Sequence, residues 1–219
     1  FGSAPNLYVL TGAGERVLAK LDGTKPRRRE VRGLVSTPFL AHELAVKDVR
    51  VWLELTARAG DGQALETWCD GEDAAFDLGR STPPKVLRPD AWFVCRLEAR
   101  VLVGLAEVDM ATERGTRRWR EKLEGYAHLF TGGKLKAVTG YANARVLVIA
   151  PTAKRRDQLA ALVSSHARAD LVPRFWLSER EVLQSHDLTA PLWRQVESPD
   201  LRPLIPATVL KQDAEGAMK

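Results

Sequence analysis

Two acidic side chains, Glu107 and Asp109, end a stretch of sequence that is otherwise apolar. Residues 100–109 alternate as a β-strand does, and this alternation puts both carboxylates on one face with Val101. Like charges at this spacing repel each other, so another group must offset them. Mg²⁺ or Mn²⁺ would do so, because these ions favour carboxylates together with water and phosphate oxygens. The pattern therefore predicts a divalent-metal site.

A third carboxylate, Asp90, begins the preceding predicted strand. A short turn at residues 98–99 joins the two strands, which predicts an antiparallel hairpin. An even number of residues in the turn places Asp90 opposite Glu107 on the same face, whereas an odd number turns Asp90 away. With a two-residue turn, Asp90, Glu107 and Asp109 meet on one patch as candidate catalytic residues and metal ligands.

The helix predicted after the hairpin, residues 113–131, adds a cation and a hydroxyl group. Arg118, Lys122 and Tyr126 follow one another at intervals of four residues and therefore share a helix face. Beside metal-bound carboxylates, Lys122 can orient the attacking water or stabilise a charged phosphate, which makes it a fourth candidate catalytic residue. Tyr126 is assigned a supporting role. The alternative is that Lys122 is a solvated surface residue and that Tyr126 packs in the core.

The first helix of the main domain is predicted to begin near Pro38 and to end near Ala59. Its apolar positions recur at nearly helical spacing: Leu40, Leu44, Val51 and Leu55. Glu43 is a second supporting candidate for the acidic site, with His42 beside it. The alternative is a surface position for Glu43 and a His42 packed between helix and sheet.

The other predicted elements surround the hairpin. Strands are predicted at residues 7–10, 64–70, 90–97, 100–109, 145–150 and 174–177, and helices at 12–21, 38–59, 113–131 and 153–167. This order predicts an α/β fold with a central mixed sheet flanked by helices. We expect an N-terminal segment and linker over residues 1–33 and the main domain over 34–186. A proline-punctuated, partly mobile extension is expected over 187–219.

The chain is mildly basic, with 33 Lys and Arg against 28 Asp and Glu and a net charge of +5. This balance permits nucleic-acid binding without requiring it, and DNA is the expected partner. Candidate contacts to the DNA backbone are the basic clusters on two predicted helices: Arg117, Arg118, Arg120, Lys154, Arg155 and Arg156. Phosphate contacts of this kind confer affinity without choosing a sequence.

Composition also limits where the protein works. No apolar run approaches the roughly 20 residues that a membrane helix needs, and no secretory signal opens the chain. The two cysteines, Cys69 and Cys95, lie in apolar stretches, which suits reduced thiols in a cytosol. We therefore expect a cytoplasmic protein without membrane contact. Because the sequence begins at Phe1, what precedes it is left open, as is homodimer formation.

The acidic residues also carry a resemblance to a known superfamily. Pro89-Asp90, followed a hairpin later by Glu107-Val108-Asp109, resembles the PD-(D/E)XK nucleases. The resemblance implies a restriction-endonuclease-like αβββαβ core. Asp109 stands where that superfamily usually has a lysine, but some members carry this lysine on the next helix, where Lys122 would fit.

A second resemblance is closer. Residues 107–113, Glu-Val-Asp-Met-Ala-Thr-Glu, followed by Lys122 and Tyr126, resemble the central motif of the replication-relaxation family of bacterial plasmid and mobile-element proteins. The resemblance covers roughly residues 7–177. It implies a role in DNA replication or mobilisation, with other replication or mobilisation proteins as further partners.

Weaker flanking pieces extend this resemblance. Residues 8–11 with Gly14 resemble the exit from that family's winged-helix DNA-binding domain, and residues 42–48 resemble the start of its second half. Residues 1–33 would then be the end of a winged-helix segment. The recognition helix of such a domain is not found after Phe1.

Three functions remain open at this point. The first is a metal-dependent DNA nuclease or nicking protein. The second is a non-catalytic DNA-binding replication-accessory protein that keeps the nuclease fold as a scaffold. The third is an adaptor in a replication or conjugation complex, for which six tryptophans offer hydrophobic anchors, although most of them are expected in the core.

Overall fold

The computed structural model describes residues 12–21, 23, 25, 37–59, 63–79, 85–97, 100–112 and 116–205. The chain divides into two compact units, Phe1–Leu40 and Ala41–Lys219. In the first unit, helix α1 (Gly12–Leu21) agrees with the helix predicted over the same residues. The predicted strand at residues 7–10 lies outside the described residues, and so do residues 26–33 of the predicted linker.

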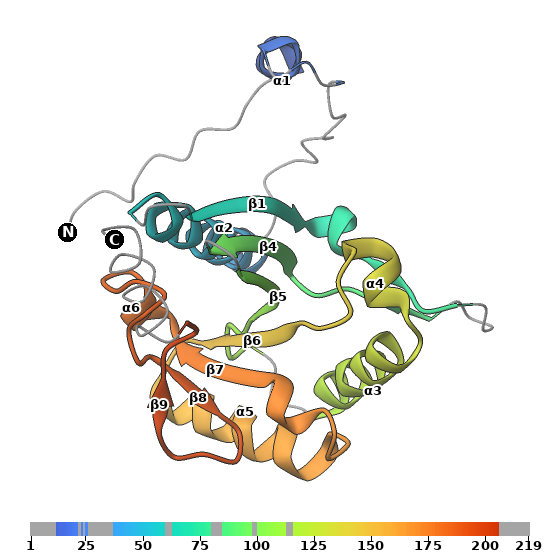
Figure 1. Ribbon diagram of the computed structural model, residues 1–219, viewed down its shortest axis with the longest axis vertical. Helices are drawn as coiled ribbons and strands as arrows, with labels where there is room; N and C mark the ends of the chain where they lie inside the picture. Colours follow the sequence, from blue (N-terminus) through green and yellow to red (C-terminus); the bar gives the residue numbers. More distant parts are fainter. Residues whose placement is uncertain are drawn as a thin grey trace, which may run out of the picture. The chain divides into compact units, whose positions relative to one another are not determined.

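The larger unit is built on a mixed sheet of seven strands (Figure 1). The strands are β1 (Gln63–Asp70), β4 (Ala91–Leu97), β5 (Arg100–Val108), β6 (Arg145–Ala150), β7 (Phe175–Glu179), β8 (Trp193–Gln195) and β9 (Leu201–Arg202), in this spatial order. β5, β6 and β7 run parallel, whereas β1 and β4 on one side and β8 and β9 on the other pair antiparallel. A separate two-stranded sheet joins β2 (Phe76–Asp77) to β3 (Val86–Leu87).

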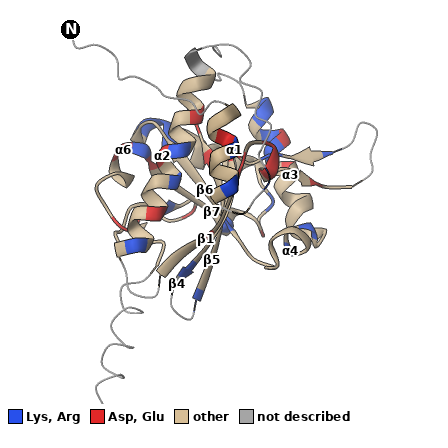
Figure 2. Cartoon of the chain, turned by 90° about the horizontal axis from the view of Figure 1, so that it is seen from above, with Lys and Arg blue, Asp and Glu red and all other residues tan. Residues whose placement is uncertain are grey.

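Helices lie on both faces of the large sheet. Their bounds are α2 (Thr37–Ala59), α3 (Arg117–Thr131), α4 (Lys134–Thr139), α5 (Ala153–His166) and α6 (Arg180–Leu183), with two 3₁₀ turns, η1 (Gly71–Ala74) and η2 (Val172–Arg174). Side chains of α3, α4 and α5 form one core with the sheet, and those of α2 and α6 form the other. Charged positions fall mostly on helices and strand ends rather than inside the sheet (Figure 2). No helix among the described residues is long and apolar enough to cross a membrane.

Most predicted elements are present at nearly the predicted bounds. The two strands of the predicted hairpin are β4 and β5, the predicted strand at 145–150 is β6, and the helix predicted from residue 153 is α5. β6 is apolar along its length because an interior parallel strand is covered on both faces. The helix predicted from residue 113 begins instead at Arg117 as α3, and the short helix α4 was not predicted.

The buried face of α2 is not the one that its most apolar positions suggested. Leu44, Val51 and Leu55 are exposed to solvent. The buried side chains are Ala45, Val46, Val49, Trp52, Leu53 and Ala57. The helix is apolar on two sides, and the side that carries alanines packs against the sheet. The spacing of apolar residues did not show which of the two apolar faces of α2 would be buried, and packing against the sheet determines it.

The chain after Asp187 is not simply an extension, as the sequence suggested. It contributes β8 and β9, which complete one edge of the sheet. Trp193 on β8 and Leu204 after β9 are buried in the core on the α2 side. The expected extension is therefore part of the domain up to residue 205, and the residues beyond it lie outside the described part.

The tryptophans belong to the core rather than to a surface of hydrophobic anchors. Five of them are buried: Trp52, Trp92, Trp119, Trp176 and Trp193. The sixth, Trp68, is half-buried and stacks on Phe93, with 6.1 Å between the ring centroids. The described tryptophans therefore give no support to the adaptor hypothesis.

A glycine in β5 leaves room for this aromatic stack, and replacing it should destabilise the fold. Gly104 lies opposite Phe93, and a Cβ atom at Gly104 would lie 2.2 Å from Cζ of Phe93. Gly104→Ala should lower the free energy of unfolding by about 1–3 kcal/mol, because the buried ring cannot give way without strain. Urea denaturation measures this loss. The same substitution should cost less in a Phe93→Leu background, and an equal cost in both backgrounds would show that the ring is not the cause.

Candidate functional site

The register of the β4–β5 hairpin brings Asp90 next to Glu107. Leu97 pairs with Arg100, so the connection contains two residues, and Ala91 pairs with Ala106 at the other end. The strand pairing ends with this pair, and Asp90, the next residue, lies beside the end of β5, where the charges of Asp90 and Glu107 act on each other. The backbone N–H of Asp90 donates to the carbonyl of Ala106 at 3.0 Å. The even turn predicted from the sequence is therefore confirmed.

Glu107 lies near the end of β5 on the face that α3 covers, and its side chain is only 1 % exposed. Lys122 Nζ donates to Glu107 Oε2, and the hydroxyl of Tyr126 donates to Oε1 at 2.6 Å. Lys122 and Tyr126 are one helical turn apart, as the spacing predicted. Tyr126 is fully buried, and Lys122 Nζ lies 5.9 Å from the ring centroid of Trp119.

Asp90 receives its contacts from β5 and from α2. The backbone N–H of Val108 donates to Asp90 Oδ2 at 2.7 Å, and His42 Nε2 lies 3.3 Å from the same oxygen. The sequence prediction chose Glu43 as the supporting residue on this helix, but His42 makes the contact. Helical spacing could have identified it, because His42 precedes buried Ala45 by three residues and therefore shares its face.

Asp109 has a different partner from the one predicted. Its two carboxylate oxygens accept hydrogen bonds from Arg155 Nε at 2.8 Å and Nη2 at 3.0 Å. Its backbone N–H donates to Ile149, which continues the pairing of β5 with β6. Among the described residues, no three His, Cys, Asp or Glu side chains are grouped so that they could hold a metal ion. The expected patch of three carboxylates is therefore reduced to Asp90 and Glu107.

The environment of this cluster shifts the acidity of its members. Burial raises the pKa of Glu107 to about 7, against the opposing charge of Lys122. Burial also acts to raise the pKa of Asp90, but the hydrogen bond with His42 and the charge of Lys122 outweigh it and hold the pKa below its ordinary value. Burial acts to lower the pKa of Lys122, and the charges of Glu107 and Asp90 reverse this and raise it. Burial and Glu107 raise the pKa of Tyr126 well above its ordinary value.

The hydrogen bond to Asp90 raises the pKa of His42, although burial opposes the shift. His42 therefore stabilises the charged form of Asp90, and Asp90 stabilises the protonated form of His42. Across the cluster, Lys122 stays a cation and Tyr126 stays a donor, while Asp90 stays ionised. Glu107 is the carboxylate of the cluster whose protonation changes near neutral pH.

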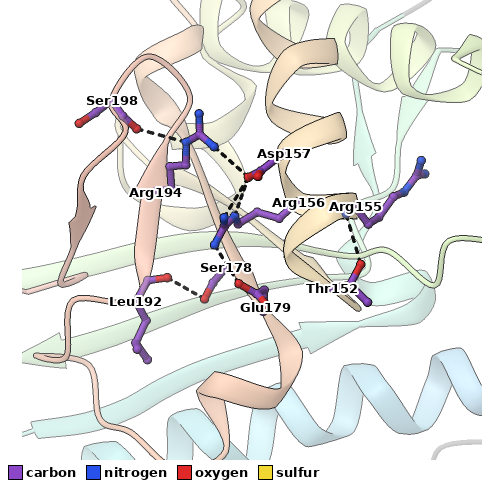
Figure 3. Close-up of polar contacts among 9 residues, drawn as sticks. All are labelled: Thr152, Arg155, Arg156, Asp157, Ser178, Glu179, Leu192, Arg194 and Ser198. Carbon is purple, nitrogen blue, oxygen red and sulfur yellow. Dashed lines mark hydrogen bonds and ion pairs between the residues drawn. The ribbon is translucent and has the colours of Figure 1, made fainter.

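Two of the arginines expected to hold DNA are engaged within the protein. Arg155 binds Asp109 as described. Arg156 lies between Asp157 and Glu179, as Figure 3 shows, with Nη1 donating to Glu179 Oε1 at 2.8 Å and Nη2 2.9 Å from Asp157 Oδ1. Both arginines are largely buried side chains in ion pairs between elements. They fit a structural role better than the predicted contact with DNA.

The other predicted DNA-contacting residues remain on the surface. Arg117, Arg118 and Arg120 are exposed on the first turn of α3, and Lys154 is exposed on the first turn of α5. Arg117 pairs with Glu121 one turn later, at 2.9 Å between Arg117 Nε and Glu121 Oε1. These side chains are therefore basic groups at the surface, at the starts of α3 and α5.

The cluster has the chemistry of a small oxygen-ligand site. Proteins usually bind Mg²⁺ through one or two carboxylates, and water and phosphate oxygens complete the coordination shell. Asp90 and Glu107 could supply two such carboxylates, although both oxygens of Glu107 already accept hydrogen bonds, whereas Asp109 is bound to Arg155. Lys122 adds a positive charge that could meet a phosphate group.

Fold and site together define an α/β protein whose buried acidic and basic side chains gather at the carboxyl end of β5. A family model described as replication-relaxation matches residues 1–144, and the chain belongs to this family. The family predicted from the sequence is thus confirmed. The match includes Asp90, Glu107, Lys122 and Tyr126 and ends before β6 begins. Neither a curated protein nor a solved structure matches the chain.

The raised pKa of Glu107 predicts a pH dependence of stability. Between the ordinary value of 4.5 and about 7, the unfolded chain has released the proton that folded Glu107 retains. The free energy of unfolding should therefore fall as pH rises through this window, by at most about 1.4 kcal/mol per pH unit from this group. Urea denaturation of the wild type and Glu107→Gln should show a steeper fall in the wild type. Glu121→Gln should keep the wild-type slope, and a Glu107→Gln slope equal to both would refute the assignment.

Proposed function

We propose that this protein binds DNA and cleaves a phosphodiester bond with the help of a divalent metal, in the replication or mobilisation of a plasmid or mobile element. The observation that carries the proposal is the position of Asp90 beside the end of β5, where Lys122 binds Glu107. The family supports the role in replication. The resemblance of Pro89-Asp90 and Glu107-Val108-Asp109 to the PD-(D/E)XK nucleases supports the cleavage.

The energetic cost of the cluster favours a chemical role. Removing a carboxylate or an ammonium group from water costs several kcal/mol, and apolar residues of similar size often stabilise a core as well or better. Glu107 is 1 % exposed and Lys122 is 18 % exposed. Perturbed ionisable groups packed together in this way are typical of functional sites.

Each member of the cluster has a distinct task in this proposal. A Mg²⁺ or Mn²⁺ ion held by Asp90 and Glu107 would act as a Lewis acid and activate a bound water. Lys122 carries positive charge to the phosphate group as negative charge develops there. Tyr126 keeps Glu107 oriented through its hydroxyl group, and His42 does the same for Asp90.

The attacking group in this proposal is water rather than the tyrosine of the cluster. Tyr126 is fully buried, and its hydroxyl group donates a hydrogen bond to Glu107. Its pKa is raised well above the ordinary value, which keeps it protonated and a poor nucleophile. Cleavage should therefore leave no covalent adduct between DNA and Tyr126.

A second candidate is a non-catalytic DNA-binding accessory protein that retains a nuclease-like scaffold. Two observations favour it. Both oxygens of Glu107 already accept hydrogen bonds from Lys122 and Tyr126. In addition, the strand position that carries a lysine in most PD-(D/E)XK nucleases is Asp109, which Arg155 neutralises. Cleavage assays separate the two candidates.

Supercoiled plasmid incubated with the protein and Mg²⁺ or Mn²⁺ should be nicked. Asp90→Asn and Glu107→Gln should each lower the rate by at least about 100-fold, because each removes a charged ligand. Asp48→Asn is the matched control, since Asp48 is exposed on α2, and it should cleave as the wild type does. Gel electrophoresis of the topological forms gives the rates. Absence of wild-type cleavage with both metals would reject the nuclease and leave the accessory protein.

DNA affinity should depend on the exposed basic positions whether or not cleavage occurs. Replacing Arg118, Arg120 and Lys154 together by alanine should weaken binding to a random duplex. It should also lower the salt slope, the steepness with which the logarithm of the binding constant falls with the logarithm of salt concentration, by roughly 2–3, because each side chain would neutralise one phosphate. Fluorescence anisotropy across a range of salt concentrations measures both effects. Arg58→Ala, on the exposed face of α2, should leave the slope unchanged. Equal slopes for the triple variant and the wild type would place the DNA elsewhere.

A further inference from the structure

Lys122 occupies the place where a cation is needed beside Glu107. Its Nζ atom donates a hydrogen bond to Glu107 Oε2, and the hydroxyl of Tyr126 donates one to the other oxygen, Oε1, at 2.6 Å. The carboxylate is almost entirely shielded from solvent. Both oxygens that a metal would use are therefore engaged by donors from α3.

The same ammonium group also acts on Asp90. The charge of Lys122 stabilises ionised Asp90, and the charges of both carboxylates stabilise protonated Lys122. Asp90 Oδ2 is further engaged by the N–H of Val108 and by His42. A divalent cation placed between the two carboxylates would thus compete with a cation that the protein already supplies.

Of the two donors to Glu107, Lys122 has the more flexible and the more exposed side chain. A lysine has a flexible four-carbon stem and rotatable donors, and this side chain is 18 % exposed. Tyr126, in contrast, is fully buried in the core. The turn of α3 before Lys122 carries the exposed residues Arg118 and Arg120, which favour the approach of a phosphate group.

We propose that Lys122 holds, in the DNA-free protein, the position beside Glu107 that a divalent cation would take, and that a DNA phosphate draws Lys122 away. This inference rests on the proposed metal-dependent function and adds an order of binding to it. Lys122 keeps the affinity of the free protein for metal low. The metal site then becomes available when a phosphate is present to receive the ammonium group.

Binding of Mn²⁺ to the full chain without DNA tests this inference. Lys122→Met removes the competing charge while keeping the length of the side chain, and it should bind Mn²⁺ at least about tenfold more tightly than the wild type. Electron paramagnetic resonance of unbound Mn²⁺ measures the affinity. Lys136→Met removes a charge from an exposed position on α4 by the same substitution and should bind as the wild type does. Lys122→Ala serves as a second variant if circular dichroism shows that Lys122→Met is misfolded.

The outcomes separate this inference from the proposed function. Measurable Mn²⁺ binding that is equal or weaker in the folded Lys122 variants would overturn the displacement and leave metal-dependent cleavage standing. Absence of Mn²⁺ binding in wild type and variants alike would overturn both. Adding Glu107→Gln to Lys122→Met should remove the gain in affinity, and a gain that persists would place the ion elsewhere and overturn the inference.

Discussion

The burial of one carboxylate, that of Glu107, sets the conditions that the rest of the domain has to meet. β5 is an interior strand, paired with β4 on one side and β6 on the other, so Glu107 cannot turn toward solvent at a sheet edge. Donors must come from the helix that covers this face. α3 supplies them at adjacent turns with Lys122 and Tyr126, which fixes how that helix lies on the strand. The same contacts therefore position α3 on the sheet and balance the charge of the site.

A chain of ion pairs connects the strand that carries the site to strands beyond the residues that the family model matches. Figure 3 shows the part that joins α5 to β7 and β8. The pairs are Asp109–Arg155, Arg156–Glu179 and Asp157–Arg194. Each joins elements far apart in the sequence, and the carboxyl ends of the parallel strands β5 to β7 lie along this line. The strands after residue 144 thus support the end of β5, through the bond of Asp109 to Ile149 and the ion pair of Asp109 with Arg155.

Local patterns predicted those parts of the structure that depend on neighbouring residues. Turn parity predicted the even connection that brings Asp90 to the end of β5 beside Glu107, and four-residue spacing predicted the joint position of Lys122 and Tyr126. Partners distant in sequence could not be predicted in this way. Arg155 is 46 residues from Asp109, and periodicity does not indicate that the two meet. The short strands β8 and β9, of three and two residues among prolines, carry too little alternation to be recognised.

The charge that balances Glu107 comes from a helix, α3, because Asp109 at the end of β5 brings no positive charge to the site. Asp109 instead adds negative charge, and Arg155 cancels it within a bidentate pair, so neither residue helps to balance Asp90 and Glu107. The balancing charge must then come from outside the sheet. Lys122 supplies this charge on a flexible stem. The positive charge beside Glu107 can therefore shift without a change in the sheet that holds the two carboxylates.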